Sequence, residues 1–405
     1  MTLKLCSDRL DRIASDIRGK NFYLALELEK KGEKILKLNT GNPAAFGFGM
    51  PDSVRAALAE KMDRAVGYCD VRGMPDARES IYNYHVSNGI ENFTMDNIFI
   101  GNGVSEIASM LGKAMLNPGD EVLVPAPCYS LWVNEILLND AVPVYYKCRE
   151  EDGWNPDPEM IRSLITDKTK AILIINPNNP TGALYSNEIL LEIIEIARQN
   201  KLVLWSDEIY DRLVFDGKPF TSTAALAKDI TVVTMNGLSK SHCLCGFRTG
   251  WLVVSGPEEP RNEICSNLLK LASVRLSANA IMQTIIPDAM ADTAYTQAMI
   301  RPGGRLYEQR KATCDELDKI DGVSYVKNSG GFYLFPKIAK EALDITNDKE
   351  FAHQLLLEKH VLIVPGSGFK WDTPDHFRIV MLPQPEVLAQ AMREIGDFIR
   401  THDKI

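Results

Sequence analysis

Short apolar runs alternate with amphipathic stretches between residues 97 and 254 of the 405-residue chain. The apolar runs predict seven strands: "NIFI" (97–100), "EVLVPA" (121–126), "VPVYY" (142–146), "AILII" (171–175), "LVLWS" (202–206), "TVVTM" (231–235) and "GWLVV" (250–254). The stretches 105–116 and 186–200 predict helices, because apolar residues recur in them at the spacing of one helix face. Runs such as "AILII" lack polar alternation, so both faces of these strands are expected to be covered, as in a parallel sheet between helices.

The pattern changes after about residue 290. The runs "GVSYVKNSGGFYLFPKI" (322–338), "VLIVPGSGF" (361–369) and "DHFRIVML" (375–382) predict short strands, and 348–359 and 385–400 predict helices. The sequence therefore predicts an α/β fold with a mostly parallel, seven-stranded sheet flanked by helices, and a smaller α+β domain. The expected division is an amino-terminal segment (1–48) that packs with the small domain, a large domain (49–295) and a small carboxyl-terminal domain (296–405).

Composition narrows the classes of function. The formal net charge of −9 disfavours a nucleic-acid or anionic-membrane partner, since both need a basic surface. We find no apolar run long enough to span a membrane and no apolar signal-peptide core at the amino terminus. Eight cysteines without a C-x-x-C pair predict reduced thiols in the cytoplasm. His242, Cys243 and Cys245 lack a distant second pair of donors, so we expect no metal site.

Polar motifs follow the predicted strands, and in open α/β sheets ligands bind beyond the carboxyl ends of the strands. These motifs are "GNGVSE" (101–106), "NPNNPTG" (176–182), "DEIYDRL" (207–213) and "NGLSKSHCLCGFRTGW" (236–251). The first is either an anion-binding helix start or a structural turn. Asp207 is either a helix cap or a buried carboxylate that meets a cation. Lys240 is either a surface charge or an amine held for chemistry.

Taken together, the motifs favour a ligand-binding and catalytic role over a purely structural one. An amine for a Schiff base, a carboxylate for a ring nitrogen, donors for a phenolic oxygen and a phosphate-binding turn are the needs of pyridoxal phosphate. The chain also resembles the fold-type I pyridoxal-phosphate aminotransferases of class I and II over essentially its full length. Within them it is most similar to the bacterial alanine (glutamate–pyruvate) transaminases. The matching motifs are "DIRG" (16–19), "LNTGNP" (38–43), "GYCD" (67–70), "VPAP" with Tyr129, "INPNNPTG", "DEIYD", the Lys240 segment and "RPGGRLYEQR" (301–310).

This resemblance implies the exchange of the amino group between L-alanine and 2-oxoglutarate in two half-reactions, through a Schiff base on Lys240. It implies that Lys240, Asp207 and Tyr210 are catalytic. The cofactor contacts that it implies are Tyr68, Gly103, Val104, Ser105, Tyr129, Asn179, Asp207, Tyr210, Ser239, Lys240 and Arg248. Burial beside Arg248 and the protonated aldimine system of the bound cofactor is expected to lower the pKa of Lys240, since the reaction needs an uncharged amine.

The resemblance also implies the substrate contacts and the assembly. Arg378 would bind the substrate α-carboxylate as a fork, near Gly41 and Asn179, while Ile17 and Arg18 would close over the site. Arg18 is the first candidate for the distal carboxylate of glutamate, and Arg275 is the second. Tyr68 would reach the phosphate of a neighbouring subunit, which implies a homodimer.

Two positions depart from the family pattern. Gly237 stands where a hydroxyl residue often contributes to the phosphate cradle, and Ser15 stands where a larger aromatic residue is usual. Two alternative activities stay open: an aminotransferase with an aspartate, aromatic or branched-chain donor, and a C–S β-lyase. A DNA-binding regulator carrying this fold is disfavoured by the net charge.

Overall fold

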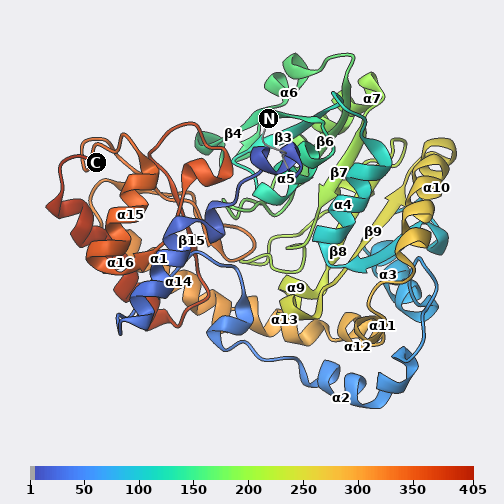
Figure 1. The fold of residues 1–405 in the computed structure, drawn as a ribbon, viewed down its shortest axis with the longest axis horizontal. Coiled ribbons are helices and arrows are strands. Elements are labelled where there is room, and N and C mark those ends of the chain that lie inside the picture. Colours follow the sequence, from blue (N-terminus) through green and yellow to red (C-terminus); the bar gives the residue numbers. More distant parts are fainter. Residues whose placement is uncertain (1–4) are drawn as a thin grey trace.

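A large sheet between helices forms one part of the molecule, and smaller sheets with helices form the other (Figure 1). The computed structural model describes residues 5–405; residues 1–4, the start of the predicted amino-terminal segment, lie outside the described residues. No helix formed by the described chain is both long and apolar enough to span a membrane. The predicted domain boundaries at residues 48 and 295 stay predictions.

Within residues 5–405 the large sheet has eight strands, in the order β2-β9-β8-β7-β6-β3-β4-β5. Their bounds are β2 Ile98–Asn102, β3 Glu121–Ala126, β4 Val142–Arg149, β5 Asn155–Pro156, β6 Thr169–Ile175, β7 Val203–Asp207, β8 Val232–Gly237 and β9 Thr249–Ser255. Neighbours from β8 to β4 pair in parallel, whereas β9 is antiparallel to both β8 and β2. The seven predicted strands are therefore confirmed, and the two-residue β5 adds an eighth, antiparallel to β4.

Residues along each strand alternate between two apolar layers. In β6, Ile172 and Ile174 join one core cluster, and Leu173 and Ile175 join the other. Both layers are buried, which is why the sequence shows an unbroken apolar run instead of alternating polarity.

Helices cover both faces of the sheet (Figure 1). One layer contains residues of α4 (Val104–Met115), α5 (Ser130–Leu138) and α10 (Glu258–Arg275). The other contains residues of α2 (Asp52–Lys61), α3 (Pro75–Ser87), α6 (Pro158–Leu164), α7 (Asn187–Asn200), α8 (Thr223–Leu226) and α12 (Ile286–Ala291). The shorter α9 (Leu238–Ser241), α11 (Ala280–Gln283) and α13 (Thr293–Ile300) complete this part.

The carboxyl-terminal unit is built from short strands and three longer helices. Its elements are α14 (Arg305–Leu317), β10 (Val323–Ser324), β11 (Tyr333–Leu334), β12 (Lys337–Ile338), α15 (Asp348–Lys359), β13 (Val361–Leu362), β14 (Val364–Pro365), β15 (Phe377–Val380) and α16 (Pro385–Thr401). β15 lies between β11 and β14, antiparallel to each. The predicted helices 348–359 and 385–400 are thus confirmed to within a residue.

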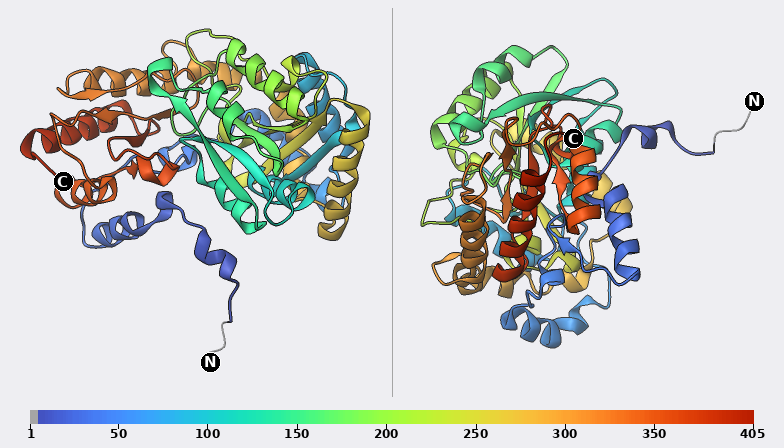
Figure 2. Two further views of the ribbon diagram at one scale, coloured as in Figure 1. Left: turned by 90° about the horizontal axis from the view of Figure 1, so that it is seen from above. Right: turned by 90° about the vertical axis from the view of Figure 1, so that its left-hand side faces the viewer.

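The amino-terminal segment joins this unit. The strand β1 (Leu36–Lys37) pairs in parallel with β13, and residues of α1 (Lys20–Lys30) pack with Leu356 and Leu362. Two 3₁₀ turns, η1 (Asp8–Arg12) and η2 (Asp16–Arg18), precede α1, and the dark blue segment that carries them projects from the body of the molecule (Figure 2). Asn134 of α5 exchanges hydrogen bonds of 3.0 and 3.4 Å with the backbone of Ala14. The segment therefore connects the large sheet with the carboxyl-terminal unit.

Candidate active site

The carboxyl ends of the central strands lie level at one edge of the large sheet. Ile175 of β6 pairs with Asp207 of β7, and Asp207 pairs with Met235 of β8. The loop that begins at Asn176, the carboxylate of Asp207 and the short helix that carries Lys240 therefore start at the same edge. The sequence predicted this grouping, and the strand register produces it.

Lys240 is partly buried at this edge. Its Nζ donates a hydrogen bond of 2.8 Å to the carbonyl oxygen of Gly41 and lies 3.7 Å from Sγ of Cys245. Burial lowers the pKa of Lys240, but Tyr333, Cys245 and Tyr129 raise it, and the net direction is upward. The prediction of a lowered pKa concerns Lys240 with the cofactor bound, where a positive charge lies beside the amine, and it stays a prediction.

Asp207 ends β7 and is buried. Its carboxylate accepts hydrogen bonds from the indole nitrogen of Trp132 at 2.8 Å and from the amide of Ile209 at 3.3 Å. Burial raises the pKa of Asp207 to about 6, although Trp132, Ile209 and Lys240 lower it. A buried carboxylate that has two donors, and no ion pair within residues 5–405, is suited to meet a cation.

Arg378 lies on β15 of the carboxyl-terminal unit. It is 1% exposed, and its guanidinium donates to Oδ1 of Asn179 at 3.0 Å and to the carbonyl of Asn39. Its Nε is buried and has no partner among the described residues. Burial lowers the pKa of Arg378. An unpaired buried N–H on a cation is costly unless an anion reaches it, so this arginine is arranged to bind a carboxylate.

The start of α4 and Arg248 form the predicted anion cradle. The first amides of a helix have no partner inside it, which leaves those of Val104 and Ser105 available. Gly103, at φ +81°, brings its backbone so near that a Cβ would lie 2.4 Å from Arg248. The sequence suggested that the amide of Gly103 also binds the anion. This amide already donates to the carbonyl of Gly101 at 2.8 Å, so it is not free for a ligand.

Gly237 has a structural reason to lack a side chain. A Cβ at this position would lie 2.5 Å from the carbonyl oxygen of Thr249 on the neighbouring β9. The hydroxyl that the family often carries here therefore cannot fit. Ser239, the residue before Lys240, is 9% exposed and is the nearest hydroxyl to Gly237 along the chain.

The predicted closing segment lies beside Arg378. Asn39, whose carbonyl accepts from Arg378, donates from its side chain to the carbonyl of Ile17 at 3.0 Å. Arg18 is exposed, and no ion pair involves it within residues 5–405. Ser15 is exposed as well and precedes η2.

Arg275, in contrast, is engaged within this chain. Its guanidinium forms an ion pair of 2.8 Å with Glu106 and donates to the carbonyls of Val71 and Ile100 at 3.0 and 3.2 Å. This geometry disfavours Arg275 as a distal-carboxylate ligand.

Two tyrosines differ in their placement. Tyr129 directly precedes α5, and burial raises the pKa of its hydroxyl, so the predicted contact of Tyr129 with the cofactor stays a prediction. Tyr68 is 84% exposed. Tyr68 is therefore free to contact a neighbouring molecule.

Sequence reasoning missed four residues of the site: Asn39, Trp132, Cys245 and Tyr333. Asn39 and Cys245 lie within recognised motifs, so their proximity to the strand ends was a usable signal. Trp132 and Tyr333 come from α5 and β11, and nothing in their local sequence indicates a site. Tyr333 is the partner of the predicted Tyr210: their hydroxyls lie 2.8 Å apart.

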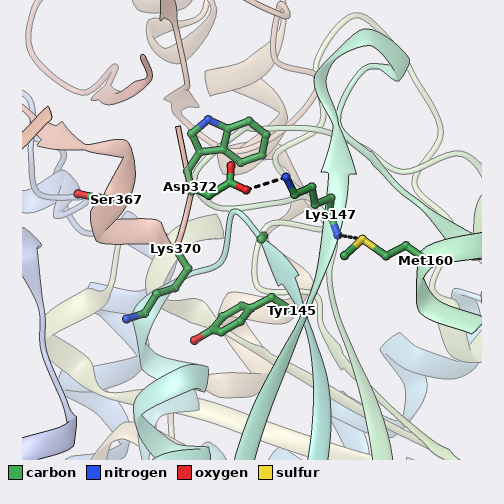
Figure 3. Close-up of a pocket in the computed structure, with 8 residues that line it drawn as sticks. Tyr145, Lys147, Met160, Ser367, Lys370 and Asp372 are labelled. Atoms are coloured by element: carbon green, nitrogen blue, oxygen red, sulfur yellow. Dashed lines mark hydrogen bonds and ion pairs between the residues drawn. The ribbon is translucent and has the colours of Figure 1, made fainter. Parts of the chain in front are cut away.

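A separate cavity of about 380 Å³ lies where β4 meets the segment after β14. Figure 3 shows Lys147 of β4 paired with Asp372 across it, at 2.6 Å. Its lining contains none of the predicted site residues, so it is distinct from the Lys240 site.

The Lys240 site fits pyridoxal phosphate in two respects and a carboxylate substrate in a third. A helix start with Arg248 beside it suits a phosphate, the buried Asp207 suits a protonated ring nitrogen, and the orphaned Nε of Arg378 suits a carboxylate substrate. Lys240 follows β8 at the same edge of the sheet, and an amine there is the group that could bond to the aldehyde of this cofactor.

Comparisons with known proteins agree with this geometry. The family model described as aminotransferase class I and II matches residues 33–395. The glutamate-pyruvate aminotransferase AlaA of Haemophilus influenzae is 46% identical over 97% of this chain and 97% of its own length. The crystal structure of an aminotransferase from Escherichia coli superposes with a TM-score of 0.97 at 42% identity, covering 100% of both chains. An alanine aminotransferase from Pyrococcus furiosus gives 0.92 at 37% identity, covering 98% of this chain and 99% of its own.

Proposed function

Since this chain belongs to the class I and II aminotransferases, we propose that it transfers the amino group of L-alanine to 2-oxoglutarate, giving pyruvate and L-glutamate. The observation that carries the proposal is full-length similarity to proteins named for these substrates, at 46% identity to the Haemophilus influenzae protein. The family depends on pyridoxal phosphate, and we propose that this cofactor binds at Lys240.

Pyridoxal phosphate supplies an aldehyde that can bond covalently to an amine and a ring that takes up the electron pair of a broken Cα–H bond. In the proposed mechanism Lys240 would hold the cofactor through its Nζ, and the same amine would carry the Cα proton of the substrate. Asp207 would hold a proton at the ring nitrogen, and its burial would strengthen that interaction. Tyr210 and Asn179 would donate to the phenolic oxygen, and Tyr129 would pack against the ring.

The proposed phosphate contacts are the amides of Val104 and Ser105, the backbone around Gly103, the hydroxyls of Ser105 and Ser239, and Arg248. The substrate α-carboxylate binds Arg378, near Asn179 and Gly41. Ile17 covers this end of the site, since its carbonyl is tied to Asn39 and through Asn39 to Arg378.

The proposed pair of substrates places opposite demands on the far end of the site. Glutamate and 2-oxoglutarate bring a second carboxylate, whereas alanine and pyruvate bring a methyl group. A fixed, buried arginine would be left unpaired by alanine, at a cost. Arg18 is exposed and outside any ion pair of the described chain, so it can bind a carboxylate or remain hydrated. This supports acceptance of both substrates.

We also propose a homodimer in which Tyr68 completes the neighbouring site. Val66 and Tyr68 are 88% and 84% exposed, and Val274 on a second segment is 86% exposed. Arg275 connects the two segments by donating to Val71. Exposed apolar side chains on adjoining segments are typical of an interface.

The substrate proposal is tested with a panel of amino donors against 2-oxoglutarate. Alanine should have the highest kcat/KM, and glutamate should be formed in equal amount to pyruvate. Strong aspartate, aromatic or branched-chain activity without alanine activity would overturn the substrate assignment. Release of pyruvate and ammonia from cystathionine without an oxo-acid acceptor would support the β-lyase alternative instead.

The dimer is tested by light scattering and by complementation. Lys240→Ala and Tyr68→Ala chains are co-expressed, because one site of the mixed dimer would then have both residues intact. Partial recovery of activity is expected. Two inactive chains that stay inactive when mixed, in a dimer demonstrated by light scattering, would remove Tyr68 from the neighbouring site.

A further inference from the structure

Tyr333 contacts three residues of the candidate site: Tyr210, Gly41 and Arg378. It lies on β11 in the carboxyl-terminal unit and is 2% exposed. Its hydroxyl is 2.8 Å from that of Tyr210, which follows β7 of the large sheet. The same hydroxyl lies so close to Gly41 that a Cβ there would be 2.2 Å from it. Gly41 in turn accepts the hydrogen bond of Lys240.

The ring of Tyr333 has a second contact. The guanidinium carbon of Arg378 lies 4.7 Å from the centre of this ring, and it lies at the same distance from the centre of the Phe369 ring. A guanidinium packed on aromatic faces loses freedom to reorient. The ring of Tyr333 thus helps to fix the group that binds the substrate carboxylate.

The number of protons that the two tyrosine hydroxyls can donate decides the role of the Tyr333 hydroxyl. A tyrosine hydroxyl has one proton to donate, so in the Tyr210–Tyr333 pair one residue donates and the other accepts. If Tyr210 donated to Tyr333, it would have no proton left for the phenolic oxygen of a cofactor. If Tyr333 donates, Tyr210 is free to donate onward, and successive hydrogen bonds strengthen one another.

We propose that Tyr333 is a positioning residue that donates to Tyr210 and so directs the hydroxyl proton of Tyr210 at the phenolic oxygen of pyridoxal phosphate, while its ring holds Arg378. This inference rests on the proposed function. Because Tyr210 and Tyr333 come from different parts of the molecule, the bond also makes the donor strength of Tyr210 depend on how those parts meet.

The hydroxyl and the ring are separated by two substitutions. Tyr333→Phe removes the donor and keeps the ring, so kcat should fall roughly 2- to 12-fold, as for one neutral hydrogen bond, with KM unchanged. Tyr333→Leu also removes the ring, so KM should rise for every amino and oxo acid. Tyr325→Phe is the matched control, since its hydroxyl bonds to Asp318 at 2.7 Å, away from the site.

A spectroscopic readout distinguishes positioning from general stability. A donor to the phenolic oxygen stabilises the form of the bound cofactor in which that oxygen carries the full negative charge. The pH midpoint of the visible absorbance of the loaded enzyme should therefore rise in Tyr333→Phe, by less than in Tyr210→Phe. Thermal melting of each variant, with and without cofactor, reports any change in folding.

The double variant decides whether Tyr333 acts through Tyr210. With Tyr210→Phe already present, adding Tyr333→Phe should move neither the midpoint nor kcat further. Additive effects, or an unchanged midpoint in Tyr333→Phe alone, would overturn the inference and leave the proposed function standing. An unchanged midpoint in Tyr210→Phe would overturn both the inference and the proposed contact of Tyr210 with the cofactor.

Discussion

The indole nitrogen of Trp132 donates a 2.8 Å hydrogen bond to Oδ2 of Asp207, and both side chains are buried. Trp132 comes from α5 and Asp207 from the end of β7, so the bond fixes the carboxylate against the helix layer of the large sheet. Burial raises the pKa of Asp207 to about 6 despite this donor. The carboxylate is held in place but short of positive charge, a state that a protonated ring nitrogen would relieve.

Replacing Asp207 with asparagine should leave the fold intact and lower kcat by two or more orders of magnitude, because the charge that holds the ring proton is lost. Steady-state kinetics and circular dichroism measure the two effects. Asp229→Asn, at an exposed ion pair with Arg198, is the control. Full activity of the Asp207 variant across the pH range would exclude this role.

The same substitution should change how stability depends on pH in the cofactor-free protein. Because the folded pKa of Asp207 is raised from 3.8 to about 6, its contribution is fully present below pH 3.8 and is lost as pH rises through 6. The loss is about 3 kcal/mol. The urea midpoint of Asp207→Asn should therefore rise relative to that of wild type as the pH increases from 4 to 7. The buried acids Glu208 and Asp211 are present in both proteins, so their contributions cancel in the difference between the two midpoints. Parallel curves of urea midpoint against pH for the two proteins would contradict the prediction.

Lys240→Ala should abolish the visible absorbance of lysine-bound cofactor and slow each half-reaction by several orders of magnitude, since one positioned acid–base group is worth roughly 10²–10⁴-fold. Borohydride treatment followed by mass spectrometry checks the covalent bond. A cofactor adduct on the variant protein together with normal turnover would show that another amine does this work.

Arg378→Lys should lower kcat/KM for alanine and for glutamate alike, by at least ~1.5 kcal/mol, because an ammonium cannot reproduce the fork of N–H donors. The variant also loses one of the bonds to Asn179 and Asn39. Initial rates at varied substrate give the value, and the exposed Arg393→Lys is the control. A loss confined to glutamate would mean that Arg378 binds the distal carboxylate instead.

Arg18→Ala should weaken glutamate and 2-oxoglutarate more than alanine and pyruvate, because only the first two bring a distal carboxylate. Arg275→Ala should lower the melting temperature through loss of the Glu106 ion pair and leave the ratio of substrates unchanged. KM values for all four substrates separate these outcomes. Equal losses in Arg18→Ala would reduce Arg18 to a general part of the closing segment.

Much of the site could be predicted because its residues stand directly after apolar runs. Composition identifies the strands, and three features follow them directly in the sequence: the loop from Asn176, Asp207 and Lys240. Because ligands bind at the carboxyl ends of the strands in open α/β sheets, these features could be assigned to one site. The sequence showed that Gly237 departs from the family pattern and that Gly103 lies in a turn, but it did not show why either position is a glycine. The Cβ positions at 2.5 Å from Thr249 and 2.4 Å from Arg248 depend on how β9 returns beside β2 and β8.

The sequence by itself determined the alternation of strands and helices, the edge at which polar residues gather and the chemical kinds of those residues, because these follow from local periodicity and from residues next to one another in the chain. Only the tertiary structure decided that Trp132 meets Asp207, that Tyr333 meets Tyr210 and that Arg275 is engaged by Glu106. It also decided that the pKa of Lys240 is raised. The three contacts join side chains between 75 and 169 positions apart in the chain, and their distances are set by packing between layers, which no local pattern encodes.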